Sequence, residues 1–268
     1  MAIRPERLRR LAGHSHLCGR CRSFFFCVVA VLAYPGVALL IGLLAWWLFK
    51  APVVPKSSGQ LVQFCEQELA RHPNAPSFRL LVMTHYGMPA YEAALAASQR
   101  FQQTLPADFG TADQLLHAHL LTYLGEYQPA VALYTHMLEH GTPSAAIYAG
   151  RGYVYTVIAE YLLAIQDCSQ AIALEPNMAY AYNNRGLALH RLGMSAEGRA
   201  DIERSLRLDG YNAYAYRNLG IYHFDQGDYQ AALSLFEQAH HLGTAPPELA
   251  SYLTQTRQQL GLGLAAGE

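Results

Sequence analysis

Residues 213–246 read AYAYRNLGIYHFDQGDYQAALSLFEQAHHLGTAP, and the spacing of residue types in this stretch decides the fold. Its glycine, Gly220, recurs 34 residues earlier as Gly186 and again as Gly152. A tyrosine stands four residues before each glycine, and small residues recur 12 and 19 residues after it. These recurring positions are Tyr148, Tyr182 and Tyr216, then Ala164, Gly198 and Ala232, and finally Ala171, Ser205 and Ala239. A fixed period predicts a stack of equivalent units, because a single unit cannot bury its own apolar face.

This period, with one aromatic, two small and one large apolar residue at these offsets, resembles the tetratricopeptide repeat. The series most similar to a consensus unit of that family is Tyr216, Gly220, Gly227-Asp228-Tyr229, Ala232, Phe236 and Ala239. The resemblance implies an all-α fold in which each unit is two antiparallel helices and the units stack into a right-handed superhelix. Glycine is needed where two helices cross closely, since a side chain would push the backbones apart.

The repeat fixes most of the predicted domain organisation. Three units follow from the glycine spacing (145–178, 179–212 and 213–246), and weaker copies precede them at 111–144 and, in divergent form, at 75–108. The divergent copy stays in phase only with a two-residue insertion, Phe109-Gly110. In chain order we expect a basic arm (1–23), a transmembrane helix (24–49), a linker (50–59), N-terminal helices (60–110), four repeat units (111–246), and a capping helix with a tail (247–268). An amphipathic helix is predicted at 60–72, and the capping helix at 248–260, with Leu249, Leu253 and Leu260 on its apolar face.

The segment Phe24–Phe49, FFFCVVAVLAYPGVALLIGLLAWWLF, carries no charge over 26 residues. A helix of this length reaches about 39 Å, enough to cross a hydrocarbon core about 30 Å thick with some tilt. A cleaved signal peptide is the alternative, but its apolar run is about 7–15 residues and a small-x-small cleavage site should follow it. Trp46-Trp47-Leu48-Phe49-Lys50 offers no such site, so residues 24–49 are predicted to be a retained membrane anchor.

Charge on the two sides of this segment predicts its orientation. Residues 1–22 hold six arginines and one acid, Glu6, for a charge of +5, whereas only Lys50 and Lys56 follow the segment closely. By the positive-inside rule the arm is cytoplasmic and the repeat domain extracytoplasmic, in the periplasm if the source is a Gram-negative bacterium. From Ser57 onward eleven arginines and no lysine stand against nineteen acids, a charge of −8. A basic arm on an acidic body indicates two compartments or two partners.

Composition excludes several classes of protein. Apolar residues make up 52% and charged residues 15%, which rules out a disordered chain. A net charge of −1 excludes a strongly basic nucleic-acid-binding protein, because neutralising phosphates takes a surplus of Lys and Arg. Five cysteines in 268 residues cannot frame a small disulfide-stapled fold. Without a P-loop or Rossmann glycine pattern, we expect neither a cofactor nor a nucleic-acid partner.

Two sets of potential metal ligands were considered. His136-Met137-Leu138-Glu139-His140 has the H-x-x-E-H order of inverted zinc peptidases, in which the histidines hold zinc and Glu139 acts as a base. This match falls on the last turn of a repeat's second helix and lacks a third ligand, so a zinc hydrolase is the alternative from another functional class and a non-enzyme is the prediction. The second set, His14, His16, Cys18 and Cys21, lies in the basic arm, where metal binding and a pair of reduced thiols both stay open.

The resemblance implies that the first helix of each unit lines a concave groove in which peptides bind. In this chain the candidate partner-binding residues are Tyr153, Tyr180, Asn183, Asn184, Tyr214, Arg217, Asn218 and Ile221. Asn184 and Asn218 match slots where clamp-type members hold a C-terminal carboxylate, but the lysines that complete the clamp are missing. Arg217 is the predicted main charged contact, since its planar fork suits a carboxylate. The alternative is that the tyrosines only pack and the asparagines are ordinary polar surface.

The expected function is therefore that of a membrane-anchored scaffold or assembly factor, which binds a protein or peptide partner without catalysis. A rival function for the same fold is a membrane co-chaperone or targeting receptor that faces the cytoplasm.

Overall fold

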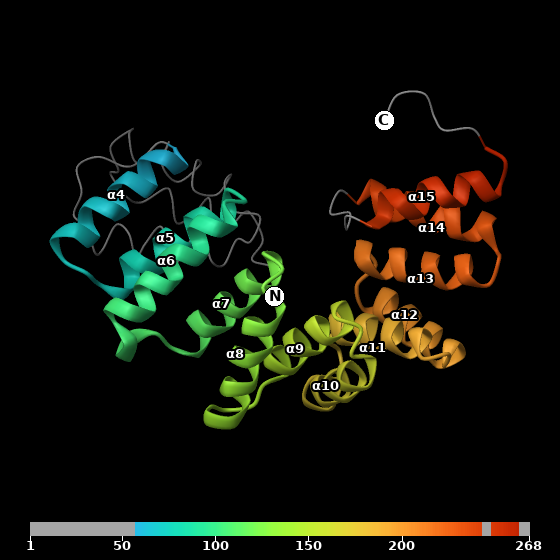
Figure 1. Cartoon of the computed structure of the whole chain (residues 1–268), viewed down its shortest axis with the longest axis horizontal. Coiled ribbons are helices and arrows are strands. Elements are labelled where there is room, and N and C mark those ends of the chain that lie inside the picture. Colours follow the sequence, from blue (N-terminus) through green and yellow to red (C-terminus); the bar gives the residue numbers. More distant parts are fainter. Residues whose placement is uncertain (1–56, 243–247, 263–268) are drawn as a thin grey trace, which may run out of the picture. The chain divides into compact units, whose positions relative to one another are not determined.

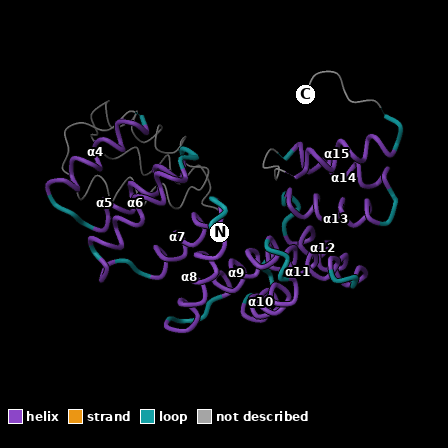
Figure 2. Tube along the Cα trace, in the orientation of Figure 1, coloured by secondary structure: helices purple, strands orange, loops and turns teal. Residues whose placement is uncertain are grey.

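The computed structural model describes residues 57–242 and 248–262. All regular structure in these residues is helical, as the trace in Figure 2 shows. In chain order (Figure 1) the helices are α4 (Ser58–Arg71), α5 (Ala75–Gly87), α6 (Tyr91–Thr104), α7 (Thr111–Tyr123), α8 (Tyr127–His140), α9 (Ala145–Val157), α10 (Tyr161–Leu174), α11 (Ala179–Arg191), α12 (Ser195–Leu208), α13 (Ala213–Asp225), α14 (Tyr229–His241) and α15 (Glu248–Gln259). A 3-10 turn, η1 (Pro106–Asp108), lies between α6 and α7.

Several expectations fall outside the described residues. They are the basic arm 1–23 with Cys18 and Cys21, the transmembrane helix 24–49 and most of the linker 50–59. Among the residues that the structure describes, no helix combines the length and the apolar character needed to cross a bilayer. The membrane anchor therefore stays a prediction from sequence.

The chain divides into two compact units between Pro89 and Ala90. The described part of the first unit is α4 and α5, whose N-termini are capped by the side chains of Ser57 and Asn74, which accept from the backbone N–H groups of Gln60 and Ser77. Serine and asparagine are favoured there because they satisfy backbone donors that the helix leaves unpaired. The division falls inside 75–108, the range predicted for the divergent repeat, so α5 and α6 belong to different compact units.

The second unit contains the regular repeats. The first helices of four consecutive pairs begin at residues 111, 145, 179 and 213, and the second helices at 127, 161, 195 and 229. Both series advance by 34 residues, the period read from the sequence. Each pair packs with its neighbours along the chain, so the units stack in order. Such stacking buries the apolar face that one pair cannot bury alone.

Close helix crossings explain the recurring glycines. A Cβ atom added to Gly186 would lie 2.6 Å from the backbone carbonyl oxygen of Gly198, on the second helix of the same pair. At Gly152 it would meet Sγ of Cys168 at 2.8 Å, and at Gly220 the ring of Phe236 at 2.5 Å. All of these distances are shorter than a normal van der Waals contact, so the expected role of the three glycines in helix crossing is confirmed.

The turn within each repeat has its own periodic geometry. Gly125, Gly193 and Gly227 adopt positive φ angles of 79°, 85° and 78° between the two helices of their pairs. Ala159 occupies the equivalent turn between α9 and α10, with φ 63°. Glycine adopts this left-handed conformation without steric cost, whereas alanine does not. The third pair of the repeat array therefore holds a strained turn.

The last repeat is closed by α15. Leu249 and Leu253 are buried against Ile221 and Phe236, and Leu260 packs at the edge of the same cluster. These are the three leucines expected on the apolar face of the capping helix. The observed helix ends at Gln259, one residue before the predicted end.

Candidate functional site

Tyrosines from the first helices of several repeats come together in space. The rings of Tyr153 on α9 and Tyr180 on α11 have centroids 5.7 Å apart. Tyr214 on α13 and Tyr123 on α7 lie within electrostatic range of Tyr153, because their phenols act on its pKa. We refer to the surface formed by Tyr123, Tyr153, Tyr180 and Tyr214 as the tyrosine face.

The tyrosine face presents phenols that stay protonated. Burial raises the pKa of Tyr153 to about 12, and burial also raises the pKa of Tyr214. Removal of phenolate from water is the cause in both residues, since the charged form loses its hydration. At physiological pH these hydroxyl groups are therefore hydrogen-bond donors as well as acceptors.

The predicted polar groove residues lie beneath this surface. Of the eight candidates, five are buried, with exposed fractions of 1% for Asn183, 3% for Asn184, 8% for Arg217, 1% for Asn218 and 2% for Ile221. Tyr153 and Tyr214 are half-buried, and Tyr180 is 39% exposed. The tyrosines are thus the accessible part of the predicted set.

Arg217 has internal partners, which differs from its expected role as the main charged contact of a ligand. Its Nη1 donates to Oε2 of Glu248 at 2.7 Å, and its Nε donates to Oδ1 of Asn218 at 3.0 Å. Asn218 in turn donates through Nδ2 to Oδ1 of Asn183, at 2.9 Å. The guanidinium also lies over the ring of Tyr214, 5.6 Å from its centroid. Arg217 therefore ties α13 to α11 and to the first residue of α15.

Asn184 differs from its neighbours in this layer. Its side chain lies next to the phenol of Tyr180, on the same helix. Its amide nitrogen Nδ2 is buried and has no hydrogen-bond partner. A buried unpaired donor costs free energy comparable to a lost hydrogen bond, so the position favours an acceptor supplied from outside.

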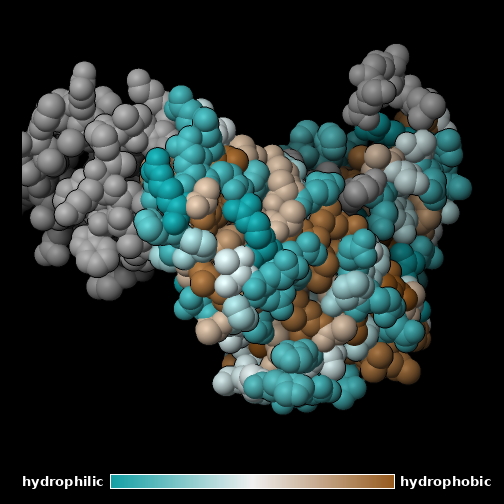
Figure 3. Space-filling model, turned by 60° about the vertical axis from the view of Figure 1, so that its left-hand side comes forward, coloured by the Kyte–Doolittle hydropathy of each residue, from teal (hydrophilic) through white to brown (hydrophobic). Residues whose placement is uncertain are grey.

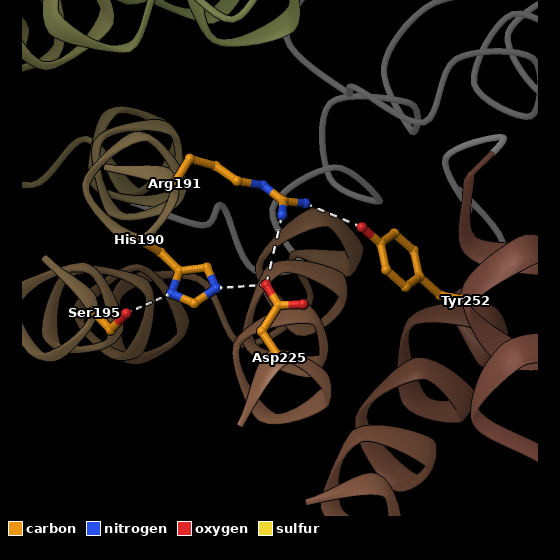
Figure 4. Close-up of polar contacts among 5 residues, drawn as sticks. All are labelled: His190, Arg191, Ser195, Asp225 and Tyr252. Atoms are coloured by element: carbon orange, nitrogen blue, oxygen red, sulfur yellow. Dashed lines mark hydrogen bonds and ion pairs between the residues drawn. The ribbon is translucent and has the colours of Figure 1, made fainter. Parts of the chain in front are cut away.

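A second polar cluster joins four helices (Figure 4). The imidazole of His190 on α11 has Nδ1 3.0 Å from Oγ of Ser195 on α12 and Nε2 2.9 Å from Oδ2 of Asp225 on α13. Arg191 donates to the same Asp225 oxygen at 3.5 Å and to the hydroxyl of Tyr252 on α15 at 3.0 Å. The sequence analysis missed this cluster, because its residues come from different slots of the repeat and from the cap. Its geometry holds the ends of α11 and α13 against α15.

The H-x-x-E-H residues lie at the exposed end of α8. The rings of His136 and His140 are stacked with centroids 4.4 Å apart, and Nδ1 of His140 lies 3.1 Å from the backbone carbonyl oxygen of His136. Among the described residues, no three His, Cys, Asp or Glu side chains are grouped so that they could hold a metal. The third ligand that a zinc hydrolase needs is therefore not supplied by the described residues.

Apolar side chains also reach the surface away from the tyrosine face. Leu162 and Leu163 on α10 are 73% and 42% exposed, and Leu174 at the end of that helix is 54% exposed. Figure 3 shows apolar residues, in brown, at the surface among hydrophilic ones. These leucines lie on a second helix, whereas the tyrosine face is built mainly by first helices. A test of partner binding must therefore separate the two surfaces.

Comparisons with known proteins agree with the repeat reading. Residues 177–242 match the family model described as tetratricopeptide repeat. Among curated proteins, the chain is 29% identical over 107 residues to heat shock protein STI1 of Saccharomyces cerevisiae, covering 40% of this chain and 18% of that protein. It is 25% identical over 206 residues to tetratricopeptide repeat protein 13 of Homo sapiens, covering 75% of this chain and 24% of that protein. The chain thus spans less than a quarter of the length of these two relatives.

The fold is also similar to that of solved structures. The crystal structure of the APC/C hetero-tetramer Cut9–Hcn1 superimposes with a TM-score of 0.65 at 16% identity, covering 77% of this chain and 41% of that chain. At this level of identity the likeness shows the fold alone. Residues 177–242 are therefore tetratricopeptide repeats, and the helix pairs around them have the α-solenoid architecture of that family.

Proposed function

We propose that the protein is a non-catalytic scaffold that binds a protein or peptide partner on the tyrosine face. The observation that carries this proposal is the convergence of Tyr123, Tyr153 and Tyr214 from three different repeats. Aromatic residues with a polar tip are enriched in interfaces, because they supply large contact area at low entropic cost. Matches to tetratricopeptide proteins support a binding role over an enzymatic one.

The proposal includes a membrane anchor formed by residues 24–49, with the repeats on the extracytoplasmic side. Its support is the 26-residue uncharged segment and the six arginines that precede it. The alternative is a co-chaperone or targeting receptor that faces the cytoplasm. The match to a protein named heat shock protein STI1 favours that alternative.

Site-specific photo-crosslinking in membranes tests the binding role. A crosslinking residue placed at Tyr180, on the tyrosine face, is compared with one placed at Leu162, on the exposed surface of α10. We expect discrete crosslinked partners from position 180 and none, or different ones, from position 162. Capture from position 162 alone would move the binding surface to α10 and contradict the proposal.

Protease protection tests the orientation separately. With intact cells or spheroplasts, external protease should digest the chain beyond residue 57 if the repeats are extracytoplasmic. Survival of the repeats until the membrane is lysed would favour the cytoplasm-facing alternative. Recovery of the full chain in the soluble fraction would contradict the anchor itself.

A further inference from the structure

The tyrosine face has little positive charge to offer a ligand. Residues 57–268 contain no lysine. Arg217, beside Tyr214, is 8% exposed and is already paired with the Glu248 carboxylate at 2.7 Å. A carboxylate-bearing ligand would have to displace Glu248 before it could use this guanidinium. Charge thus argues against an acidic tail as the occupant of this face.

The same face offers hydrogen-bond donors. The phenols of Tyr153 and Tyr214 are protonated, and Nδ2 of Asn184, in a side chain that is 97% buried by its 3% exposure, has no partner. Because Asn184 lies beside the exposed Tyr180, an acceptor arriving at the tyrosine face is close to this amide. A complementary ligand is therefore rich in acceptors and poor in donors.

An extended polyproline II segment has this chemistry. It makes no internal hydrogen bonds, so its carbonyl oxygens are all available as acceptors, and each proline lacks an N–H donor. Its rings pack on aromatic faces, and aromatic-lined surfaces are used repeatedly to bind such segments. Its backbone is already ordered before binding, which lowers the entropic cost of association.

We propose that the tyrosine face binds an extended, uncharged, proline-rich peptide segment, with the rings of Tyr153, Tyr180 and Tyr214 as the packing surface and Asn184 as a donor to a ligand carbonyl. This inference rests on the proposed binding function and adds the chemical class of the partner. It assigns Arg217 to holding α15 in place.

Fluorescence anisotropy of a labelled proline decamer, titrated with the full-length protein in detergent micelles, tests the inference. A glutamate-rich peptide and an alanine-rich helical peptide of the same length are the competing probes. We expect saturable binding of the proline peptide and at least about tenfold weaker binding of both others. Equal or tighter binding of the acidic peptide, or of the helical peptide, overturns the inference.

Variants then locate the site. Tyr153→Ala should weaken binding of the proline peptide about tenfold or more, because it removes a packing surface. Tyr153→Phe keeps the ring and should weaken binding by less than about fivefold, the effect of one hydrogen bond. Asn184→Ala should weaken binding about fivefold. Tyr211→Ala, at a residue 83% exposed in the turn before α13, is the matched control and should leave binding unchanged.

The outcomes separate this inference from the broader function. If crosslinking from position 180 captures a partner while no proline peptide binds, the binding surface stands and the partner class is wrong. If Tyr153→Phe weakens binding as much as Tyr153→Ala, ring packing is not the basis of recognition and the inference is overturned. A thermal melt followed by circular dichroism shows whether Tyr153→Ala is folded; where it is not, the Tyr153→Phe and Asn184→Ala results decide.

Discussion

The middle repeats and the last repeat join their two helices by different chemistry in the same slots. In the pair α9–α10, Arg151 binds Asp167 through two hydrogen bonds of 2.7 and 2.9 Å. In α11–α12, Arg185 binds Asp201 in the same way, at 2.6 and 3.0 Å. In α13–α14 the equivalent residues, 34 positions later, are Leu219 and Leu235, which belong to one apolar cluster.

The charged version also reaches back to the preceding repeat. The third contact of Arg151 is the hydroxyl of Thr135 on α8, and that of Arg185 is the hydroxyl of Ser169 on α10. Each arginine thus connects three helices, whereas the leucines are part of a cluster with Ile202 and Ala215. The comparison shows that the repeat specifies which positions meet, while either an ion pair or an apolar contact can satisfy the position.

The largest expected effect concerns the helix crossings of these repeats. Gly186→Ala should lower the free energy of unfolding by about 3 kcal/mol or more, because the new Cβ meets backbone atoms of Gly198 and Ile202 that cannot turn away. Gly220→Ala meets the ring of Phe236, which can shift, and should cost about 1–3 kcal/mol. Urea unfolding followed by circular dichroism measures both.

Gly210→Ala is the control for the glycine series, since its nearest neighbour would be an oxygen at 3.8 Å. It should cost within about 1 kcal/mol. Equal losses at positions 186, 220 and 210 would contradict the close crossing of α11 and α12.

The next effect tests the ion pair against the apolar pair. Arg185→Leu leaves the carboxylate of Asp201, whose side chain is 14% exposed, without its partner and should cost about 2 kcal/mol or more. The double variant Arg185→Leu, Asp201→Leu copies the residues of the last repeat and should return to within about 1 kcal/mol of the wild type. A double variant less stable than Arg185→Leu would show that the middle repeats need the charged contact itself.

A third prediction concerns pH, at the slot that precedes Arg151 by one period. His117 occupies it, with Nδ1 2.9 Å from Oγ of the buried Ser98. Burial lowers the pKa of His117 below its usual 6.5, and burial likewise lowers that of His119. The unfolded chain then binds more protons than the folded one, so stability is complete above about pH 6.5 and falls as the pH drops toward the lowered pKa.

Urea unfolding between pH 7.5 and 5 measures this dependence. We expect a smaller acid loss in His117→Gln, by about 1 kcal/mol or less, because one of the two neutral histidines is gone. An identical pH profile for wild type and His117→Gln would contradict the role of this histidine.

The smallest effect compares the turns of neighbouring repeats. Ala159→Gly should raise the free energy of unfolding by about 0.5–1 kcal/mol, because glycine relieves the left-handed turn at φ 63°. The reverse change in the next repeat, Gly193→Ala at φ 85°, should lower it by about 1 kcal/mol. A lower melting temperature for Ala159→Gly would show that the turn is not strained.

The sequence by itself determined the repeat period, the helix pairs and the crossing glycines. A residue at a given slot meets the same neighbouring slots in every unit, so Gly152, Gly186 and Gly220 report one geometry three times. The helix starts at 145, 179 and 213 follow the same rule.

Only the tertiary structure decided which polar groups are already paired. Arg217 looked like a free charge for a ligand, but Glu248, 31 residues later, occupies it. Asp225 likewise meets His190 and Arg191 of the preceding repeat, and Arg191 also reaches Tyr252 on α15. Helix α15 lies beyond the last repeat and breaks the period, so no recurring offset predicts its contacts. Periodic packing can be read from a chain, whereas the docking of its end depends on the three-dimensional surface that the last repeat presents.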